Sequence, residues 1–132
     1  MKTRIQKLAL AIIIASGVNA VASEKAPEPR DVAVGVNDVY IPGGLNYDSD
    51  VAIVVSGIFP NGCYRWKGAQ VTNLSATTHQ IQAVASVSQG MCIMVLVPFS
   101  KEIKLGRLQT GVHTVRFLNG DGTYHERSFK VQ

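Results

Sequence analysis

Alternation of apolar and polar residues with a period of two constrains this chain more than any other feature of its sequence. The pattern recurs at residues 32–36, 51–56, 80–87 and 114–117. Each run has the spacing of a strand that buries one face and leaves the other in water. After residue 30, no stretch keeps helical periodicity for three turns. The chain is therefore predicted to be all-β.

Turn sequences separate these runs. They are Pro-Gly-Gly at 42–44, Pro-Asn-Gly at 60–62, Ser-Gln-Gly at 88–90 and Asn-Gly-Asp-Gly at 119–122. The last is the strongest hairpin signal, because glycine and asparagine tolerate the positive φ of tight turns. The 88–90 turn predicts a hairpin into a central strand at 91–99, which is apolar on both faces. Seven or eight short strands in about 100 residues favour an antiparallel β-sandwich, with a small β-barrel as the alternative.

The segment 108–113 precedes one of the alternating runs and has the pattern L-x-x-G-x-Y, with histidine in the last position. Leu108, Gly111 and His113 carry the pattern. It resembles the tyrosine corner of immunoglobulin-like and fibronectin-type domains, in which an aromatic side chain bonds to backbone just upstream. The resemblance implies an immunoglobulin-like sandwich with a buried His113 bonded to backbone near Leu108. It implies no function, since such folds serve many.

The first 22 residues have the form of a secretory signal peptide. Three basic residues precede an apolar run at 8–18, and Ala20 and Ala22 form a small-residue cleavage site. A helix over this run spans about 16 Å, which is too short for a hydrocarbon core of ~30 Å. We expect cleavage after Ala22, no membrane anchor thereafter, and a periplasmic or secreted protein.

The charge distribution argues against a nucleic-acid partner. The formal net charge is +4, but three of the thirteen basic residues lie in the leader, and the remaining ten face nine acidic residues. A binder of nucleic acid would carry a larger basic excess. Residues 23–30, which contain two prolines and four charged residues, are predicted to form a flexible arm before a sandwich domain at 31–132.

The two cysteines, Cys63 and Cys92, are predicted to form a disulfide. They are an even pair in a chain with a secretory leader, and neither lies in a C-x-x-C motif. A thiol nucleophile or a metal ligand is the alternative. Closing a loop of ~30 residues stabilises a fold by roughly 3.5 kcal/mol in the chain-entropy treatment.

Catalytic motifs are missing from the sequence, including G-x-S-x-G, H-E-x-x-H, the P-loop and the dinucleotide fingerprint. We therefore expect no enzymatic activity and no cofactor. Asp48 with Asp50, and Asn119 with Asp121, are interpreted as turn residues and not as calcium ligands.

The three histidines could hold a soft metal only if the fold gathered them with methionines. We expect no metal site. His113 is instead assigned to the corner, His79 to the edge of a buried face and His125 to an exposed hairpin. Met91 and Met94 are assigned to the core.

The segment Tyr64, Arg65, Trp66 and Lys67 is the predicted partner-binding surface. It follows Cys63, so a disulfide would anchor one end, and it combines the residue types most enriched in binding hot spots. Alternation sends the two aromatic rings to one face and the two cations to the other. The alternative is that the aromatic face belongs to the core.

The function expected from these features is that of a non-enzymatic extracytoplasmic binding or accessory module. Its partner is an unidentified protein in the envelope or outside the cell. A periplasmic copper- or zinc-handling protein and a secreted enzyme inhibitor are the alternatives.

Overall fold

The computed structural model describes residue 17 and residues 27–132. Apart from Gly17, the predicted leader at 1–22 lies outside the described residues, as do residues 23–26 of the predicted arm. The described part contains eight strands: β1 (Arg30–Val34), β2 (Asp38–Tyr40), β3 (Asp50–Phe59), β4 (Tyr64–Asn73), β5 (Thr78–Val87), β6 (Val97–Arg107), β7 (Gly111–Leu118) and β8 (Tyr124–Val131).

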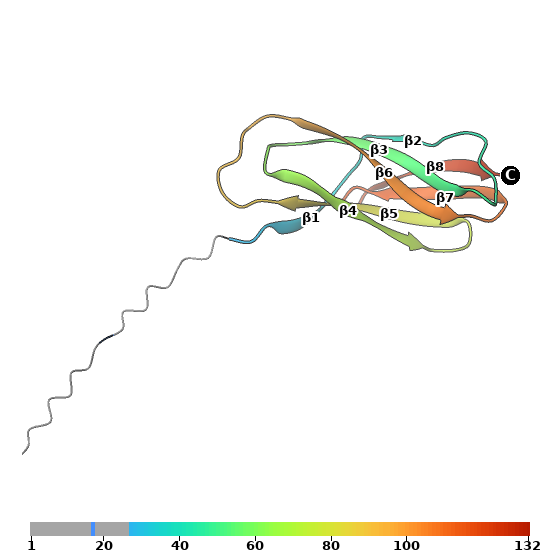
Figure 1. The fold of residues 1–132 in the computed structure, drawn as a ribbon, viewed down its shortest axis with the longest axis horizontal. Helices are drawn as coiled ribbons and strands as arrows, with labels where there is room; N and C mark the ends of the chain where they lie inside the picture. The colour runs from blue at the N-terminus through green and yellow to red at the C-terminus, as the bar shows by residue number, and fades with distance from the viewer. Residues whose placement is uncertain (1–16, 18–26) are drawn as a thin grey trace, which may run out of the picture.

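The strands form two sheets (Figure 1). One sheet has three strands in the order β2-β3-β6, and the other has five, built around β5. Strand β5 pairs with β4 along one side. On its other side, β7 pairs with residues 78–82 of β5 and β1 pairs with residues 83–87. Strand β8 completes this sheet by an antiparallel hairpin with β7, at the predicted 119–122 turn. The predicted β-sandwich is confirmed, and neither sheet closes into a barrel.

One strand pair departs from a purely antiparallel sandwich. Residues 78–82 of β5 run parallel to residues 114–118 of β7. A parallel pair needs a long connection, since its two strands must begin at the same end. Here β6, in the other sheet, lies within that connection.

The core lies between the two sheets and comes from the predicted alternation. In β3, Val51, Ile53 and Val55 are completely buried, and in the opposite sheet Ile81 and Phe117 are nearly so. A smaller cluster closes one end of the sandwich, formed by Leu45, Val51, Leu108 and Val131. The strand period read from the sequence therefore selects the buried face correctly.

The prediction for residues 88–99 is wrong in two respects. The 88–90 turn does not form a hairpin, because β5 and β6 belong to different sheets. Residues 91–96 form no strand; they belong to the loop that crosses between the sheets, and β6 begins only at Val97. Pro98 is tolerated inside β6 because this is an edge strand, whose outer side needs no backbone donor.

No helix among the described residues is long and apolar enough to cross a membrane.

Candidate functional site

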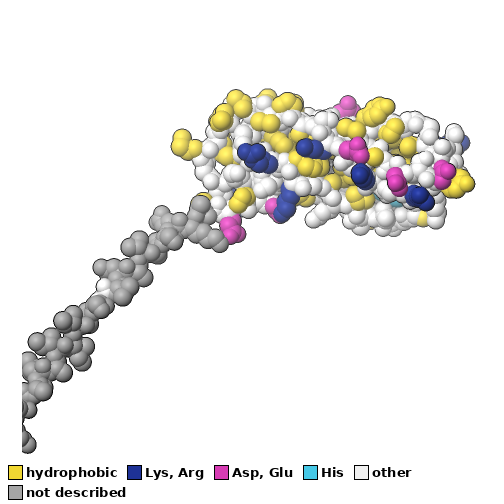
Figure 2. Space-filling view, in the orientation of Figure 1, with side chains coloured by type: hydrophobic (Ala, Val, Ile, Leu, Met, Phe, Trp, Pro, Cys, Tyr) yellow, Lys and Arg dark blue, Asp and Glu magenta, His cyan; other side chains and the backbone are white. Residues whose placement is uncertain are grey.

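Residues 91–96, here called the apolar loop, expose hydrophobic side chains at one end of the sandwich. Met91 is fully exposed, and Met94 and Leu96 are 79% and 70% exposed. Ile93 and Val95 are also exposed. Figure 2 shows hydrophobic side chains gathered at this end of the molecule. The assignment of Met91 and Met94 to the core is therefore wrong, because the chain here leaves the sheet to cross between the two layers.

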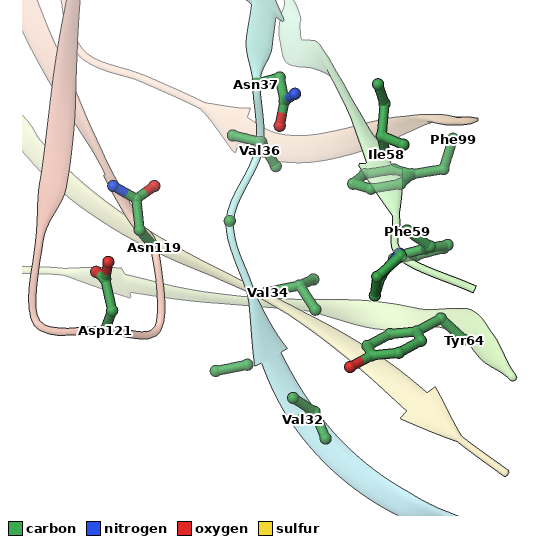
Figure 3. A pocket seen from close by; sticks show the side chains of 13 residues that line it. Val32, Val34, Val36, Asn37, Ile58, Phe59, Tyr64, Phe99, Asn119 and Asp121 are labelled. Atoms are coloured by element: carbon green, nitrogen blue, oxygen red, sulfur yellow. The ribbon is translucent and has the colours of Figure 1, made fainter. Parts of the chain in front are cut away.

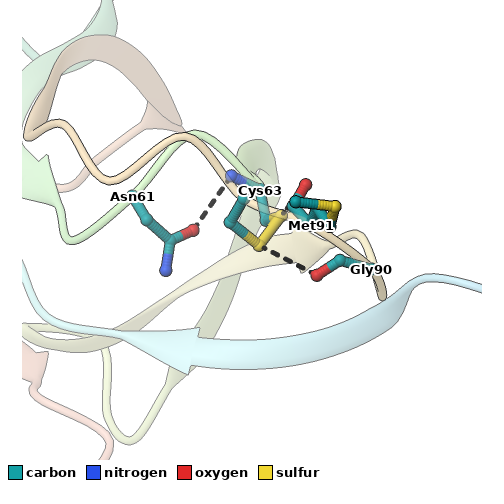
Figure 4. Close-up of a disulfide and its surroundings, with 5 residues drawn as sticks. Asn61, Cys63, Gly90 and Met91 are labelled. Atoms are coloured by element: carbon teal, nitrogen blue, oxygen red, sulfur yellow. Dashed lines mark hydrogen bonds between the residues drawn. A yellow bond between two sulfur atoms is a disulfide. The ribbon is translucent and has the colours of Figure 1, made fainter.

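The apolar loop is fastened at its base (Figure 4). Cys63 and Cys92 form the predicted disulfide, with their Cα atoms 5.2 Å apart. The Gly62 amide donates to the Ile93 carbonyl at 2.8 Å, and the Ser88 amide donates to the Cys63 carbonyl at 3.0 Å. A tight turn places Met94 at the tip, because the Val95 amide donates back to the Ile93 carbonyl at 3.0 Å. The base of the loop is thus fastened to the sandwich while its apolar side chains face water.

The predicted partner-binding segment lines a groove directly beside this loop. The groove, of about 490 Å³, runs between the start of β4 and the start of β6. Tyr64, Arg65 and Trp66 form one wall, and residues 97–101, which continue the chain from the apolar loop, form the other. The structure therefore brings together a segment selected from the sequence and a loop that the sequence interpretation placed in the core.

The aromatic rings of the predicted segment are half-buried and belong partly to the core. Trp66 packs against Phe99, with ring centroids 5.6 Å apart, and Tyr64 stacks on Phe59 at 5.7 Å. Phe99 in turn covers Gly57, where an added Cβ would lie 2.5 Å from its ring. The rings are held rigidly, and their exposed edges line the groove.

The cations alternate away from the rings, as predicted. Arg65 is exposed at the groove, whereas Lys67 forms an ion pair with Asp31 on β1. On the opposite wall, Lys101 is also exposed. Both charged residues that line the groove are therefore cations, and the groove favours an anionic or polar group on whatever it binds.

A second hollow, of about 420 Å³, lies on the other side of Tyr64 (Figure 3). Residues 32–37 line it, and the β7–β8 turn adds Asn119 and Asp121. The carboxylate of Asp121 accepts hydrogen bonds from the Thr123 hydroxyl at 2.5 Å and the Thr123 amide at 2.9 Å, and these bonds lower its pKa. The carboxylate thus has the turn role expected from the sequence.

The opposite end of the sandwich contains the histidine corner. His113 is completely buried, and its Nε2 lies 2.6 Å from the carbonyl oxygen of Gln109, to which it donates. Leu108 is also buried, and Gly111 has a φ of 138°, in the region that favours glycine. The imidazole thus makes the backbone contact that the resemblance implied.

His79 adjoins this corner, a contact that the sequence interpretation missed. Its Nε2 lies 2.9 Å from Nδ1 of His113, and its Nδ1 lies 2.7 Å from Oδ1 of Asn73. The two histidines are 34 residues apart in sequence, and only the parallel pairing of β5 with β7 brings them together. His125 lies elsewhere, stacked on Phe117. Within the described residues, no three His, Cys, Asp or Glu side chains gather closely enough to hold a metal ion.

Comparison with known proteins gives one match. A family model described as the ORF11 beta-sandwich domain matches residues 53–131, which extend from β3 to the end of β8. No curated protein and no solved structure matches the chain.

Proposed function

The chain belongs to the ORF11 beta-sandwich domain family, and we propose that it is a non-enzymatic extracytoplasmic binding module that acts through protein–protein contacts. The binding surface is the disulfide end, formed by the apolar loop and the adjoining groove. The observation that carries this proposal is the exposure of five apolar side chains on a loop fastened by a disulfide and a backbone hydrogen bond.

Exposed hydrophobic side chains favour this interpretation because their hydration is unfavourable. Burial of apolar surface contributes about 25 cal/mol per Å², and contiguous exposed patches commonly mark interaction sites. A fastened loop also loses little conformational freedom when it binds, which lowers the entropic cost of association. Gly62 and Cys63 therefore act by fixing the loop in its exposed position.

The groove indicates the chemistry of the partner. Half-buried Tyr64 and Trp66 offer rigid aromatic edges, and Arg65 and Lys101 offer two cations. Tyrosine, tryptophan and arginine are the residue types that most often dominate binding energy. We propose that the partner presents apolar side chains to the loop and a carboxylate-bearing segment to the groove.

The compartment belongs to the same proposal. The Cys63–Cys92 bond is compatible with an oxidising location outside the cytoplasm. Together with the leader sequence, it supports cleavage after Ala22 and a periplasmic or secreted mature protein. The mass of the protein purified from its source tests this, since the mature chain would begin at Ser23.

The experiment that tests the function is capture followed by reconstitution. Mature protein is used to capture partners from its native envelope and culture fluid, and each identified partner is purified and titrated. The loop variant is Ile93→Ser with Met94→Ser. Its matched control is Val112→Ser, which changes a side chain that is similarly exposed but lies at the opposite end.

We expect the loop variant to bind at least about tenfold more weakly, because each residue that dominates an interface contributes more than about 1 kcal/mol. The control should bind like the unaltered protein. Unchanged affinity in the loop variant would contradict the proposal. If the captured partner is an enzyme that loses activity on binding, the module is a secreted inhibitor.

A further inference from the structure

Four groups form a continuous hydrogen-bonded chain inside the histidine end. Asn73 ends β4, and its Oδ1 faces Nδ1 of His79 on β5. His79 meets His113 of β7 through Nε2 and Nδ1, and His113 meets the Gln109 carbonyl through Nε2. The two imidazoles, here called the histidine pair, are 2% and 0% exposed. Water is therefore excluded from the contact between the two rings, whereas Asn73 is exposed at the surface.

With Asn73 oriented as described above, the two ends of the chain fix where two protons lie. A carbonyl oxygen only accepts, so Nε2 of His113 carries a proton that it donates to Gln109. The amide oxygen of Asn73 also only accepts, so Nδ1 of His79 carries a proton as well. A neutral imidazole carries only one proton. If both rings are neutral, Nε2 of His79 and Nδ1 of His113 therefore have no proton, and their lone pairs face each other across 2.9 Å. This arrangement is unfavourable in a buried site.

Two arrangements remove the conflict. In the first, the pair holds a third proton between the rings, and Asn73 keeps its oxygen toward His79. In the second, the pair holds two protons, Asn73 turns its amide over, and its Nδ2 donates to Nδ1 of His79. The proton of His79 then lies on Nε2 and is donated to His113. Every nitrogen of the chain is satisfied in both.

We infer that the histidine pair is a proton-binding site whose occupancy sets the orientation of the Asn73 amide. The incoming proton binds Nδ1 of His79, and it can be accommodated there only when Asn73 presents oxygen instead of nitrogen. Proton uptake and amide rotation are therefore one event.

The surroundings decide which state dominates near neutral pH. Burial lowers the pKa of His79, and the neighbouring His113 lowers it further. Among the charged residues of the packed strands, Arg107 on β6 lines the hollow beside His79. Asp50 lies on β3, Asp38 on β2, and His125 and Arg127 on β8. Arg107 lies 3.9 Å from Asp50, and Arg127 lies 3.9 Å from Asp38, so each cation has an acidic partner. The two-proton state is therefore expected at neutral pH, with the Asn73 amide turned over from the orientation described above. The three-proton state, in which Oδ1 of Asn73 faces Nδ1 of His79, is expected in acid.

Rotation of the Asn73 amide changes the protein surface, because this residue lines a hollow there. Asn73, His79 and Arg107 line a hollow of about 340 Å³ beside the β4–β5 turn. In the two-proton state the Asn73 oxygen points away from His79, and after proton uptake the NH₂ group does. Because Asn73 lines this hollow, the hydrogen-bonding character of its wall changes with the proton occupancy of the pair.

Long-range ¹H–¹⁵N NMR correlation of the intact mature protein tests the inference between pH 8 and pH 4.5. At pH 8 we expect the Nε2–H form of both histidines. On acidification, His79 should gain its Nδ1 proton at the same midpoint at which the Asn73 side-chain amide signals shift. An Nδ1–H form of His79 at pH 8, or Asn73 signals that do not follow the titration, would overturn the inference.

A substitution at Asn73 tests whether this side chain acts directly on the titration of His79. Asn73→Asp places a group that only accepts beside His79, so the midpoint of His79 should rise by about 1 pH unit. Gln70→Glu adds the same charge to the exposed face of β4 and is the matched control. If the titration midpoint of His79 shifts equally in the two variants, the shift comes from net charge alone, and the coupling is contradicted.

Discussion

The two ends of the sandwich depart in opposite ways from the rule that apolar side chains are buried and polar ones exposed. At the disulfide end, five apolar side chains of one loop lie in water. At the histidine end, two polar rings lie in the core. Hydrophobicity alone would place both sets elsewhere.

The difference lies in what holds each set in place. The apolar loop is fastened at its base, by the disulfide to the buried Cys63 and by the Gly62–Ile93 hydrogen bond. The histidine pair is held from within, because each ring nitrogen faces a hydrogen-bonding group. A covalent tether can expose apolar surface, and a fully bonded network can bury polar surface at tolerable cost.

Removing the tether should have the largest effect. The double variant Cys63→Ala with Cys92→Ala is expected to lose about 2–5 kcal/mol of unfolding free energy, as is typical when a small domain loses a native disulfide. Urea unfolding followed by circular dichroism measures the loss. A decrease in unfolding free energy below about 1 kcal/mol would show that the disulfide, which joins residues 29 apart in sequence, contributes little to stability.

Breaking the buried network should rank next. His113→Ala removes a completely buried ring and leaves both His79 and the Gln109 carbonyl without that partner. We expect a loss of about 1–3 kcal/mol in the same unfolding measurement. A thermal midpoint equal to that of the unaltered protein would argue against a structural role for the corner.

Acidification should weaken the histidine end by a smaller amount. Burial, followed by the neighbouring His113, lowers the pKa of His79 in the folded protein. Below about pH 6.5 the unfolded chain therefore binds more protons, and stability falls as the pH falls. Urea midpoints between pH 8 and pH 5 should fall less in His79→Gln than in the unaltered protein. If the urea midpoints of the two proteins fall equally with pH, the pH dependence of stability comes from groups other than His79.

The apolar loop should tolerate substitution with the smallest change in stability. Ile93→Ser with Met94→Ser alters exposed side chains and keeps the disulfide, so unfolding free energy should stay within about 0.5 kcal/mol. A loss above about 1.5 kcal/mol would mean that these side chains pack against the fold. The contrast with His113→Ala thus separates a binding surface from a structural one.

The strands could be predicted from the sequence because each buries one face, and the period of two records that burial. Residues 91–96 could not, because an apolar run looks the same in a central strand and in an exposed loop. The contact of His79 with His113 depends on a parallel pairing between strands far apart in sequence. The corner at Leu108, Gly111 and His113 was visible because its spacing is local.

Photo-crosslinking compares the two ends as binding surfaces most directly. A photoreactive residue replaces Met94 in one protein and Val112 in another, and each is irradiated with the native extract. We predict a specific adduct from position 94, absent when the disulfide is removed, and none from position 112. Equal adducts from both positions, or an adduct from position 112 alone, would contradict the assignment of binding to the disulfide end.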